Sequence, residues 1–157
     1  MKTITLTSTI TECQMDELSV DEQQLVNAAI AATTNSYAPF SWFHVGAAVR
    51  LADGTIVSGC NQENVSYPVS ICAERSALHA AGALYPNTPV TMLAIAARTV
   101  KGEFQKEPIS PCGICRQAII QAETRYGHPI RILLHGKRCI YAINGISTLM
   151  PLSFKDF

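Results

Sequence analysis

The chain has little that would direct it to a nucleic acid or a membrane. Its 12 Lys and Arg residues balance its 12 Asp and Glu residues, and they form no basic run. No stretch approaches the roughly 18 consecutive apolar residues of a membrane helix, and residues 1–13 lack the apolar core of a secretory signal. We therefore expect a cytoplasmic protein that binds a small neutral ligand, with no nucleic-acid or membrane partner.

Signs of disorder and of modular repeats are also lacking. Hydrophobic residues make up 48% of the 157 residues and charged residues only 15%, which is the reverse of a disordered composition. No repeat, low-complexity tract or Pro/Gly-rich linker divides the chain. Its length suits a single domain. We predict one catalytic domain over residues 19–157, preceded by an N-terminal extension of residues 1–18.

Hydrophobic periodicity predicts helices that alternate with strands. Residues 3–11 alternate as a half-buried strand or an interface arm would, and Ser19 with Glu22 forms a capping box for a helix to about residue 34. Asp53-Gly54 predicts a hairpin between two strands. Further helices are predicted over 71–84 and 112–126, further strands over 90–97, 130–134 and 139–143, and a short helical turn near the C-terminus. This order indicates an α/β domain with helices packed over a mixed sheet.

Three of the six cysteines fall where two helices are predicted to begin. Cys112 and Cys115 form a C-x-x-C pair behind Pro111, and Cys72 stands at the start of the other helix. A helix N-terminus favours the thiolate that zinc binds. The other cysteines and the four histidines have no paired spacing with these three, which leaves one coordination position open. An open position is typical of catalytic zinc.

Glu74 lies two residues after Cys72, within reach of a water in such a position. Zinc lowers the pKa of a bound water toward about 7. A carboxylate beside it can accept the proton and later act as a general acid. Cys72-Ala73-Glu74 followed by Pro-Cys-x-x-Cys matches the three-cysteine form of the zinc-deaminase signature. A redox C-x-x-C pair and half of a structural zinc ribbon are the alternatives, but neither needs Glu74.

Further motifs extend this signature from about residue 20 to residue 154. Through them the chain resembles the cytidine deaminases, specifically their short, three-cysteine class. The motifs are SYAPFSWFHVGAAV (36–49), GCNQENVSY (59–67), ICAER (71–75), SPCGICRQ (110–117) and LMPLSF (149–154).

The resemblance implies a three-layer α/β/α fold with a five-stranded mixed sheet, to which residues 1–18 would add a strand or an arm. It implies a hydrolase with one zinc ion per chain. Such an enzyme would deaminate cytidine and deoxycytidine to uridine and deoxyuridine, release ammonia and serve pyrimidine salvage. Its partner would be a free nucleoside, and it would resemble the family's homotetramers, in which sites are shared between subunits.

The resemblance also assigns roles to residues of the substrate site. Glu74 would be the catalytic acid and base. Asn61 and Glu63 would hold the ribose hydroxyls, Phe43 would pack on the pyrimidine, and the amide of Ala73 would contact the base. Taken alone, an Asn and a Glu in a loop would more often form a solvated turn, and Phe43 would more often be a core residue.

Arg75 and Phe154 receive roles outside the pocket floor. Arg75 would donate to the thiolate sulfurs and withdraw charge from the metal site, with a surface helix arginine as the alternative. Phe154 would reach a neighbouring subunit's site, although it could belong to a disordered tail. Pro68, Phe40 and Thr148 depart from the family pattern, which puts the substrate range and the subunit packing in question rather than the chemistry.

Two other functions fit parts of the pattern. Deamination of another small molecule, or of a base within a nucleic acid, would use the same zinc and glutamate, but an editing enzyme would be expected to show a basic groove. A structural zinc module would need a fourth ligand and would have no use for Glu74.

Overall fold

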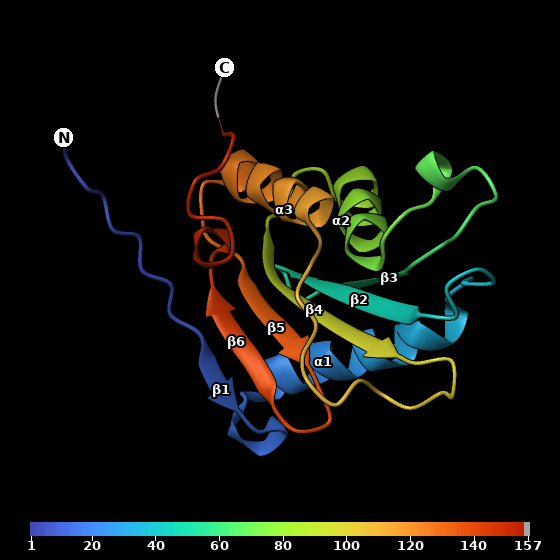
Figure 1. Ribbon diagram of the computed structural model, residues 1–157. Coiled ribbons are helices and arrows are strands. Elements are labelled where there is room, and N and C mark those ends of the chain that lie inside the picture. Colours follow the sequence, from blue (N-terminus) through green and yellow to red (C-terminus); the bar gives the residue numbers. More distant parts are fainter. Residues whose placement is uncertain (156–157) are drawn as a thin grey trace.

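A six-stranded sheet with helices on both faces organises residues 1–155, which are the residues that this computed structural model describes (Figure 1). The strands are β1 (Thr11–Cys13), β2 (His44–Leu51), β3 (Ile56–Cys60), β4 (Val90–Arg98), β5 (Arg131–His135) and β6 (Ile140–Asn144). The helices are α1 (Val20–Ala32), α2 (Ala73–Leu84) and α3 (Gly113–Tyr126), with short 3-10 turns η1 (Met15–Glu17), η2 (Thr33–Asn35), η3 (Tyr67–Val69) and η4 (Ile146–Thr148).

The strand order is β1-β6-β5-β4-β2-β3. Neighbouring strands are antiparallel except β4 and β5, which are parallel and are joined by the crossover through α3. Helix α1 covers one face, whereas α2 and α3 lie side by side on the other (Figure 1). The predicted α/β/α fold is confirmed: β2 to β6 form the mixed five-stranded sheet, and β1 is the additional N-terminal strand.

The helices begin at the residues that the sequence singled out. Ser19 caps α1, and its side chain and that of Glu22 form the predicted capping box. Cys72 is the N-cap of α2 and Cys112 is the N-cap of α3, and the close approach of their sulfur atoms shows that the two helix starts meet. Gly127 ends α3 in the left-handed conformation, with φ 71°. No helix among the described residues is long and apolar enough to span a bilayer.

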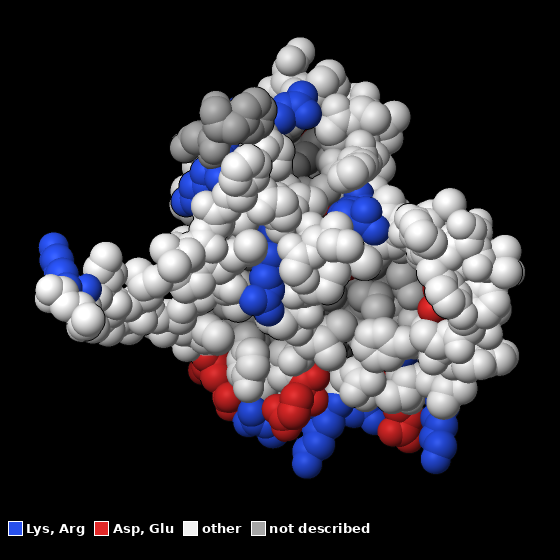
Figure 2. Space-filling view, turned by 45° about the horizontal axis from the view of Figure 1, so that its top comes forward, with Lys and Arg blue, Asp and Glu red and all other residues white. Residues whose placement is uncertain are grey.

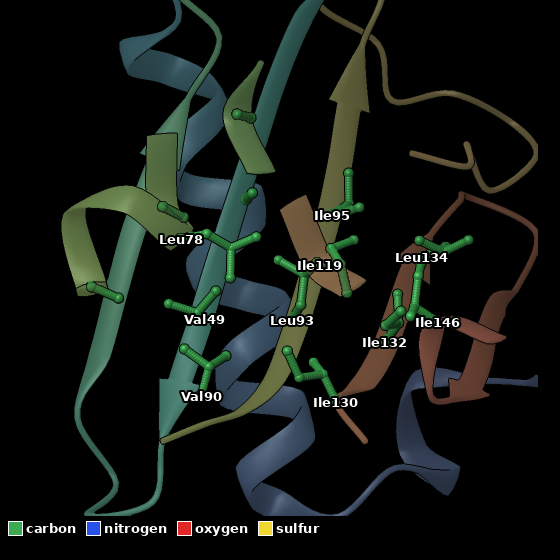
Figure 3. Packing of buried hydrophobic residues seen from close by; sticks show 14 of the residues in the cluster. Val49, Leu78, Val90, Leu93, Ile95, Ile119, Ile130, Ile132, Leu134 and Ile146 are labelled. Carbon is green, nitrogen blue, oxygen red and sulfur yellow. The ribbon is translucent and has the colours of Figure 1, made fainter. Parts of the chain in front are cut away.

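Strand β4 is buried on both faces, as its continuous apolar sequence predicts. Leu93 and Ile95 face α2 and α3, where they pack with Val49, Ile119 and Ile132 (Figure 3). On the opposite face the fully buried side chains of β2 and β4 that pack with α1 are small, those of Ala48, Ala94 and Ala96. The helices can therefore lie close to the sheet.

Two glycines fix that close approach. A methyl group on Gly46 of β2 would overlap the carbonyl of Ala29 in α1, and one on Gly59 of β3 would overlap the backbone of Ala77 in α2. Both contacts are with backbone, which cannot move aside as a flexible side chain can. Gly59 thus sets how near α2, with its zinc ligand, lies to β3.

Of the two alternatives predicted for residues 3–11, the half-buried strand is wrong for all but residue 11, which begins β1, and the interface arm stays a prediction. Residues 1–10 form no strand and are exposed, and Figure 1 shows them leading away from the sheet. The register explains the boundary: Thr11 pairs with Ala142, so Thr9 would have to pair beside Asn144, where β6 ends. Gly145, with φ 80°, then turns the chain into η4 and leaves no partner strand.

Candidate active site

Three cysteines meet where α2 and α3 begin. The sulfur atoms of Cys72, Cys112 and Cys115 all lie within 4.8 Å of one another. A zinc ion with tetrahedral Zn–S bonds of about 2.3 Å holds its sulfurs about 3.8 Å apart, so this cluster fits a zinc ion. Among the described residues no fourth Cys, His, Asp or Glu completes the group. The predicted three-ligand arrangement is present.

One cysteine of the cluster, Cys72, favours the thiolate before any metal is considered. A hydrogen bond from Cys115 lowers the pKa of Cys72 to about 5, and hydrogen bonds from Cys112 and Arg75 act in the same direction. Donating that bond, together with burial, raises the pKa of Cys115. Because soft thiolate donors suit zinc, the donor chemistry agrees with the geometry.

Glu74 is buried in the first turn of α2, with only 5% of its surface exposed. Burial raises the pKa of its carboxyl group, and the nearby Cys72 thiolate raises it further. A buried carboxyl whose pKa is raised is suited to hold and to transfer a proton near neutral pH.

Glu74 and two of the three clustered cysteines, Cys72 and Cys112, line a cavity of about 340 Å³. This is the size range of pockets for small organic ligands. The predicted residues on its wall are Phe43, Asn61, Glu63, Cys72, Ala73, Glu74 and Cys112. The fold thus brings residues from β2, the segment after β3 and both helix starts into one pocket.

Asn61 uses both ends of its amide on the backbone. Its Oδ1 accepts from the amide of Val45 and its Nδ2 donates to the carbonyl of Phe43, each at 2.8 Å. Asn61 therefore fixes the start of β2, and with it Phe43, on the cavity wall.

Glu63 ties down the loop that precedes Phe43. Its carboxylate accepts from the amides of Phe40 and Ser41, at 2.8 and 3.2 Å, and from the hydroxyl of Ser41. Within the same loop Trp42 is the one described residue other than glycine with a positive φ, 56°, and its side chain is exposed. The loop is thus strained locally and held by the carboxylate.

Sequence reasoning missed Ser41, Gln62, Ile109 and Ser110, which also line the cavity. Ser41 lies within the motif at 36–49, but its partner Glu63 is 22 residues away, and no local pattern reports that pairing. Ile109 and Ser110 lie shortly before Cys112 in the sequence. This closeness to a predicted zinc ligand is the signal that could have identified them as pocket residues.

Arg75 and Phe154 lie off the cavity wall. The guanidinium of Arg75 donates to the carbonyl of Ser70 at 3.2 Å, and its buried Nε has no hydrogen-bond partner among the described residues. Phe154 is 64% exposed, and its carbonyl accepts from Gln117 Nε2 at 2.9 Å. The chain does not place this aromatic ring in its own pocket.

The three residues that depart from the family pattern, Pro68, Phe40 and Thr148, are each accommodated by their local contacts. Pro68 lies in the first turn of η3, where its fixed φ is tolerated. Phe40 packs edge-on against Tyr67, with ring centroids 6.0 Å apart. Thr148 accepts a hydrogen bond from Ser8 Oγ at 2.7 Å through its backbone carbonyl, so its side chain is not needed for that contact.

Comparison with known proteins agrees with this site. The profile of the family described as "Cytidine and deoxycytidylate deaminase zinc-binding region" matches residues 19–126, which include the three cysteines and Glu74. Curated cytidine deaminases are similar: that of Halalkalibacterium halodurans is 40% identical over 102 residues, covering 65% of this chain and 72% of that protein. That of Mycobacterium tuberculosis is 38% identical over 118 residues, covering 71% and 81%.

Solved structures show the same fold. The crystal structure of cytidine deaminase from Burkholderia pseudomallei superposes with a TM-score of 0.72 at 35% identity, covering 83% of this chain and 97% of that one. The cysteine cluster is accordingly a site for one zinc ion per chain. The match over more than half of the chain, together with these relatives, shows that this protein is an enzyme of the cytidine deaminase family.

Proposed function

We propose that this enzyme hydrolyses cytidine and deoxycytidine to uridine and deoxyuridine, with release of ammonia, in pyrimidine salvage. One observation carries the proposal: the buried carboxyl of Glu74 lies beside an open three-cysteine cluster on the wall of a cavity of about 340 Å³. When bound by Cys72, Cys112 and Cys115, zinc supplies the Lewis acidity that lowers the pKa of a water molecule at neutral pH.

Glu74 moves the protons of this reaction. It accepts one proton from water and delivers it to N3 of the pyrimidine while the water oxygen bonds to C4. It then transfers the second proton of that water to the amine, the C4–N4 bond breaks, and ammonia leaves. Atoms and charges balance, because cytidine and water become uridine and ammonia. The raised pKa of Glu74 allows the same carboxyl to act as base and then as acid.

Four residues are proposed to hold the nucleoside. Phe43 supports the pyrimidine face, and the amide of Ala73, which as the first residue of α2 has no partner within the helix, contacts the base. Asn61 and Glu63 contact the ribose. Because both are also bonded to the loop before β2, ribose binding and the position of Phe43 are linked.

A free nucleoside suits this pocket better than a base within a nucleic acid. The chain has no net charge, and on the face that Figure 2 presents the Lys and Arg side chains lie in separate groups and form no continuous basic groove. Binding a phosphate backbone depends on clustered Lys and Arg. We place the enzyme in the cytoplasm, where its six cysteines, all free in the structure, would stay reduced.

Arg75 is proposed to tune the metal site. Three thiolates on Zn²⁺ leave a net charge of about −1, which weakens the metal as a Lewis acid. The Arg75 guanidinium helps to lower the pKa of the Cys72 thiol, and it would draw charge from that sulfur.

A homotetramer is proposed, with Phe154 completing the site of a neighbouring subunit. Large apolar side chains lie exposed on the segments around the cavity mouth and on the C-terminal tail, which suits burial against a second copy. They are Tyr37, Phe40, Trp42, Val65, Tyr67, Val69, Ile114, Leu152 and Phe154.

The decisive test follows cytidine absorbance and ammonia together, with zinc-loaded wild-type protein and Glu74→Gln. We expect stoichiometric ammonia from the wild type, and at least about a 10²-fold slower reaction from the variant because the proton carrier is lost. The zinc content of both proteins is measured as the control. A variant that keeps its zinc and its turnover would refute the role of Glu74. A wild type with one zinc per chain that turns over neither nucleoside would refute the proposed substrates.

A further inference from the structure

Arg116, the residue after the zinc ligand Cys115, joins two segments that are far apart in the sequence. Its Nε donates to the carbonyl of Pro111 at 2.9 Å, and its Nη1 donates to the carbonyl of Leu149 at 2.7 Å. Pro111 directly precedes the ligand Cys112, and Leu149 begins the C-terminal tail. The side chain is half-buried, so water competes little for these carbonyls.

The zinc-binding turn is held from two sides by this residue. The backbone amide of Arg116 donates to the carbonyl of Cys112 at 2.9 Å, while its side chain binds the carbonyl of Pro111. Two successive carbonyls of the turn therefore bond to one residue. Displacement of the guanidinium would free the Pro111 carbonyl and loosen the approach to Cys112.

The chain from η4 into the C-terminal tail is held at several points by α3. Arg116 binds the carbonyl of Leu149, Gln117 binds that of Phe154, and Glu123 Oε1 accepts from the amide of Ile146 at 2.9 Å. Among the hydrogen bonds of the described residues, only the Arg116 side chain of these three also binds the backbone that enters the zinc-binding turn. The planar guanidinium can serve two carbonyls at once, which a lysine ammonium on a flexible stem does poorly.

We propose that Arg116 is a positioning residue that holds the zinc-binding turn and the C-terminal tail against each other. A single side chain then fixes the position of the zinc-binding turn and the position of the tail that carries Phe154. The consequence for turnover rests on the proposed function, because there Phe154 serves a neighbouring pocket. The consequence for the metal site does not, since it follows from the bond to Pro111.

The test uses full-length, zinc-loaded Arg116→Ala and Arg116→Lys. The rate of zinc transfer to a chromogenic chelator and the hydrogen exchange of the amides of residues 112–117 and 149–150 are measured without substrate. We expect zinc release to accelerate by roughly 10- to 100-fold in Arg116→Ala, the range found when partners of metal ligands are removed. Both segments should exchange faster, and Arg116→Lys should recover only part of the change.

Two variants on the same helix are the controls. Arg125→Ala removes an arginine that binds the carbonyl of Pro86, and Gln117→Ala removes the contact to Phe154 alone. Both should release zinc at the wild-type rate. If Arg116→Ala does not fold, Arg116→Lys carries the comparison. Unchanged zinc release, or faster exchange in only one of the two segments, would overturn the proposal. If the wild-type enzyme does not turn over cytidine, that result would instead count against the proposed function.

Discussion

The Asn61 side chain lines the pocket and also hydrogen-bonds to the backbone of two other residues. Its amide replaces a missing strand partner for Phe43 and Val45, by accepting from one and donating to the other. A buried amide that loses such partners costs about 1–3 kcal/mol. The position of Phe43 therefore depends on a side chain 18 residues away.

We predict that Asn61→Ala lowers the free energy of unfolding by about 1–3 kcal/mol and also raises KM for cytidine. The first effect comes from the two lost hydrogen bonds and the second from a displaced Phe43. Urea unfolding and steady-state kinetics measure the two. Asn87→Ala, at an exposed turn, is the matched control. A variant as stable as the wild type would show that these bonds contribute nothing.

The residues that the sequence identified are those whose chemistry lies in a local pattern. Cys72, Glu74 and the C-x-x-C pair lie within a few residues of a helix start, so spacing alone placed them. Ser41 and Arg116 were beyond reach because their partners, Glu63 and Leu149, are 22 and 33 residues distant. Such pairings depend on how the strands and helices pack, which spacing does not encode.

Helix α1 depends on its first turn for part of its stability. Ser19 Oγ accepts from the amide of Glu22 at 3.3 Å, and Glu22 Oε2 accepts from the amide of Ser19 at 3.0 Å. Glu22 also binds Arg131 of β5 at 3.0 Å, which attaches the helix start to the sheet.

We predict that Ser19→Ala destabilises the protein by about 1 kcal/mol, as the loss of a helix cap does. Glu22→Ala should cost more, because it removes the other half of the capping box and the ion pair with Arg131. Chemical denaturation of both variants checks the order. Equal stability of the two would mean that the contact with β5 contributes little.

His135, the last residue of β5, is a buried histidine that makes the stability of the protein depend on pH. Its ring packs edge-on against Phe104 with centroids 5.2 Å apart, and its Nδ1 is buried without a hydrogen-bond partner among the described residues. Burial lowers the pKa of this imidazole below its ordinary value. The unfolded chain therefore binds a proton at a higher pH than the folded one.

Stability should fall as the pH drops below about 6.5, the pKa of an unfolded histidine, until the lower folded pKa is passed. Above that pH the imidazole is neutral in both states and has no such effect. We predict that the free energy of unfolding of His135→Gln changes less with pH than that of the wild type between about pH 7.5 and 5. Unfolding free energies across that range test it, with His128→Gln at a partly exposed position as the control. Parallel curves for the wild type and His135→Gln would contradict the assignment.

Periodicity predicted the helices and the inner strands, because each buries a face whose spacing is visible in the sequence. It failed at residues 3–10, where the alternation of Ile4 and Leu6 with threonines is that of a strand. A strand also needs a partner, and β6 ends at Asn144. The end of a neighbouring strand is a property of the sheet and not of the segment itself.

Over the whole molecule, zinc joins two helices that lie side by side on one face of the sheet. Cys72 belongs to the start of α2, and Cys112 and Cys115 to the start of α3. A ligand that binds only the folded state stabilises that state by about 4 kcal/mol when the free ligand concentration is 1,000 times its Kd. Metal removal should therefore affect the stability of the entire domain.

We predict that chelation lowers the melting temperature by roughly 8–16 °C, from about 2–4 °C per kcal/mol for a domain of this size. Differential scanning calorimetry of zinc-loaded and chelated protein measures the difference. Cys60→Ser, outside the cluster, should show the same shift as the wild type. Cys115→Ser should melt near the chelated wild type whether or not zinc is added. Identical melting of the loaded and chelated forms would exclude a stabilising metal.

The chain contains one tryptophan, and the fold places it in the loop that Glu63 ties down. Trp42 stands between Ser41, which bonds to that carboxylate, and Phe43, which lines the cavity. Its indole is 56% exposed, so its emission responds to solvent at this one place. The protein thus carries an intrinsic fluorescent probe of its own pocket, and ligand binding or loop movement can be followed by emission without a label.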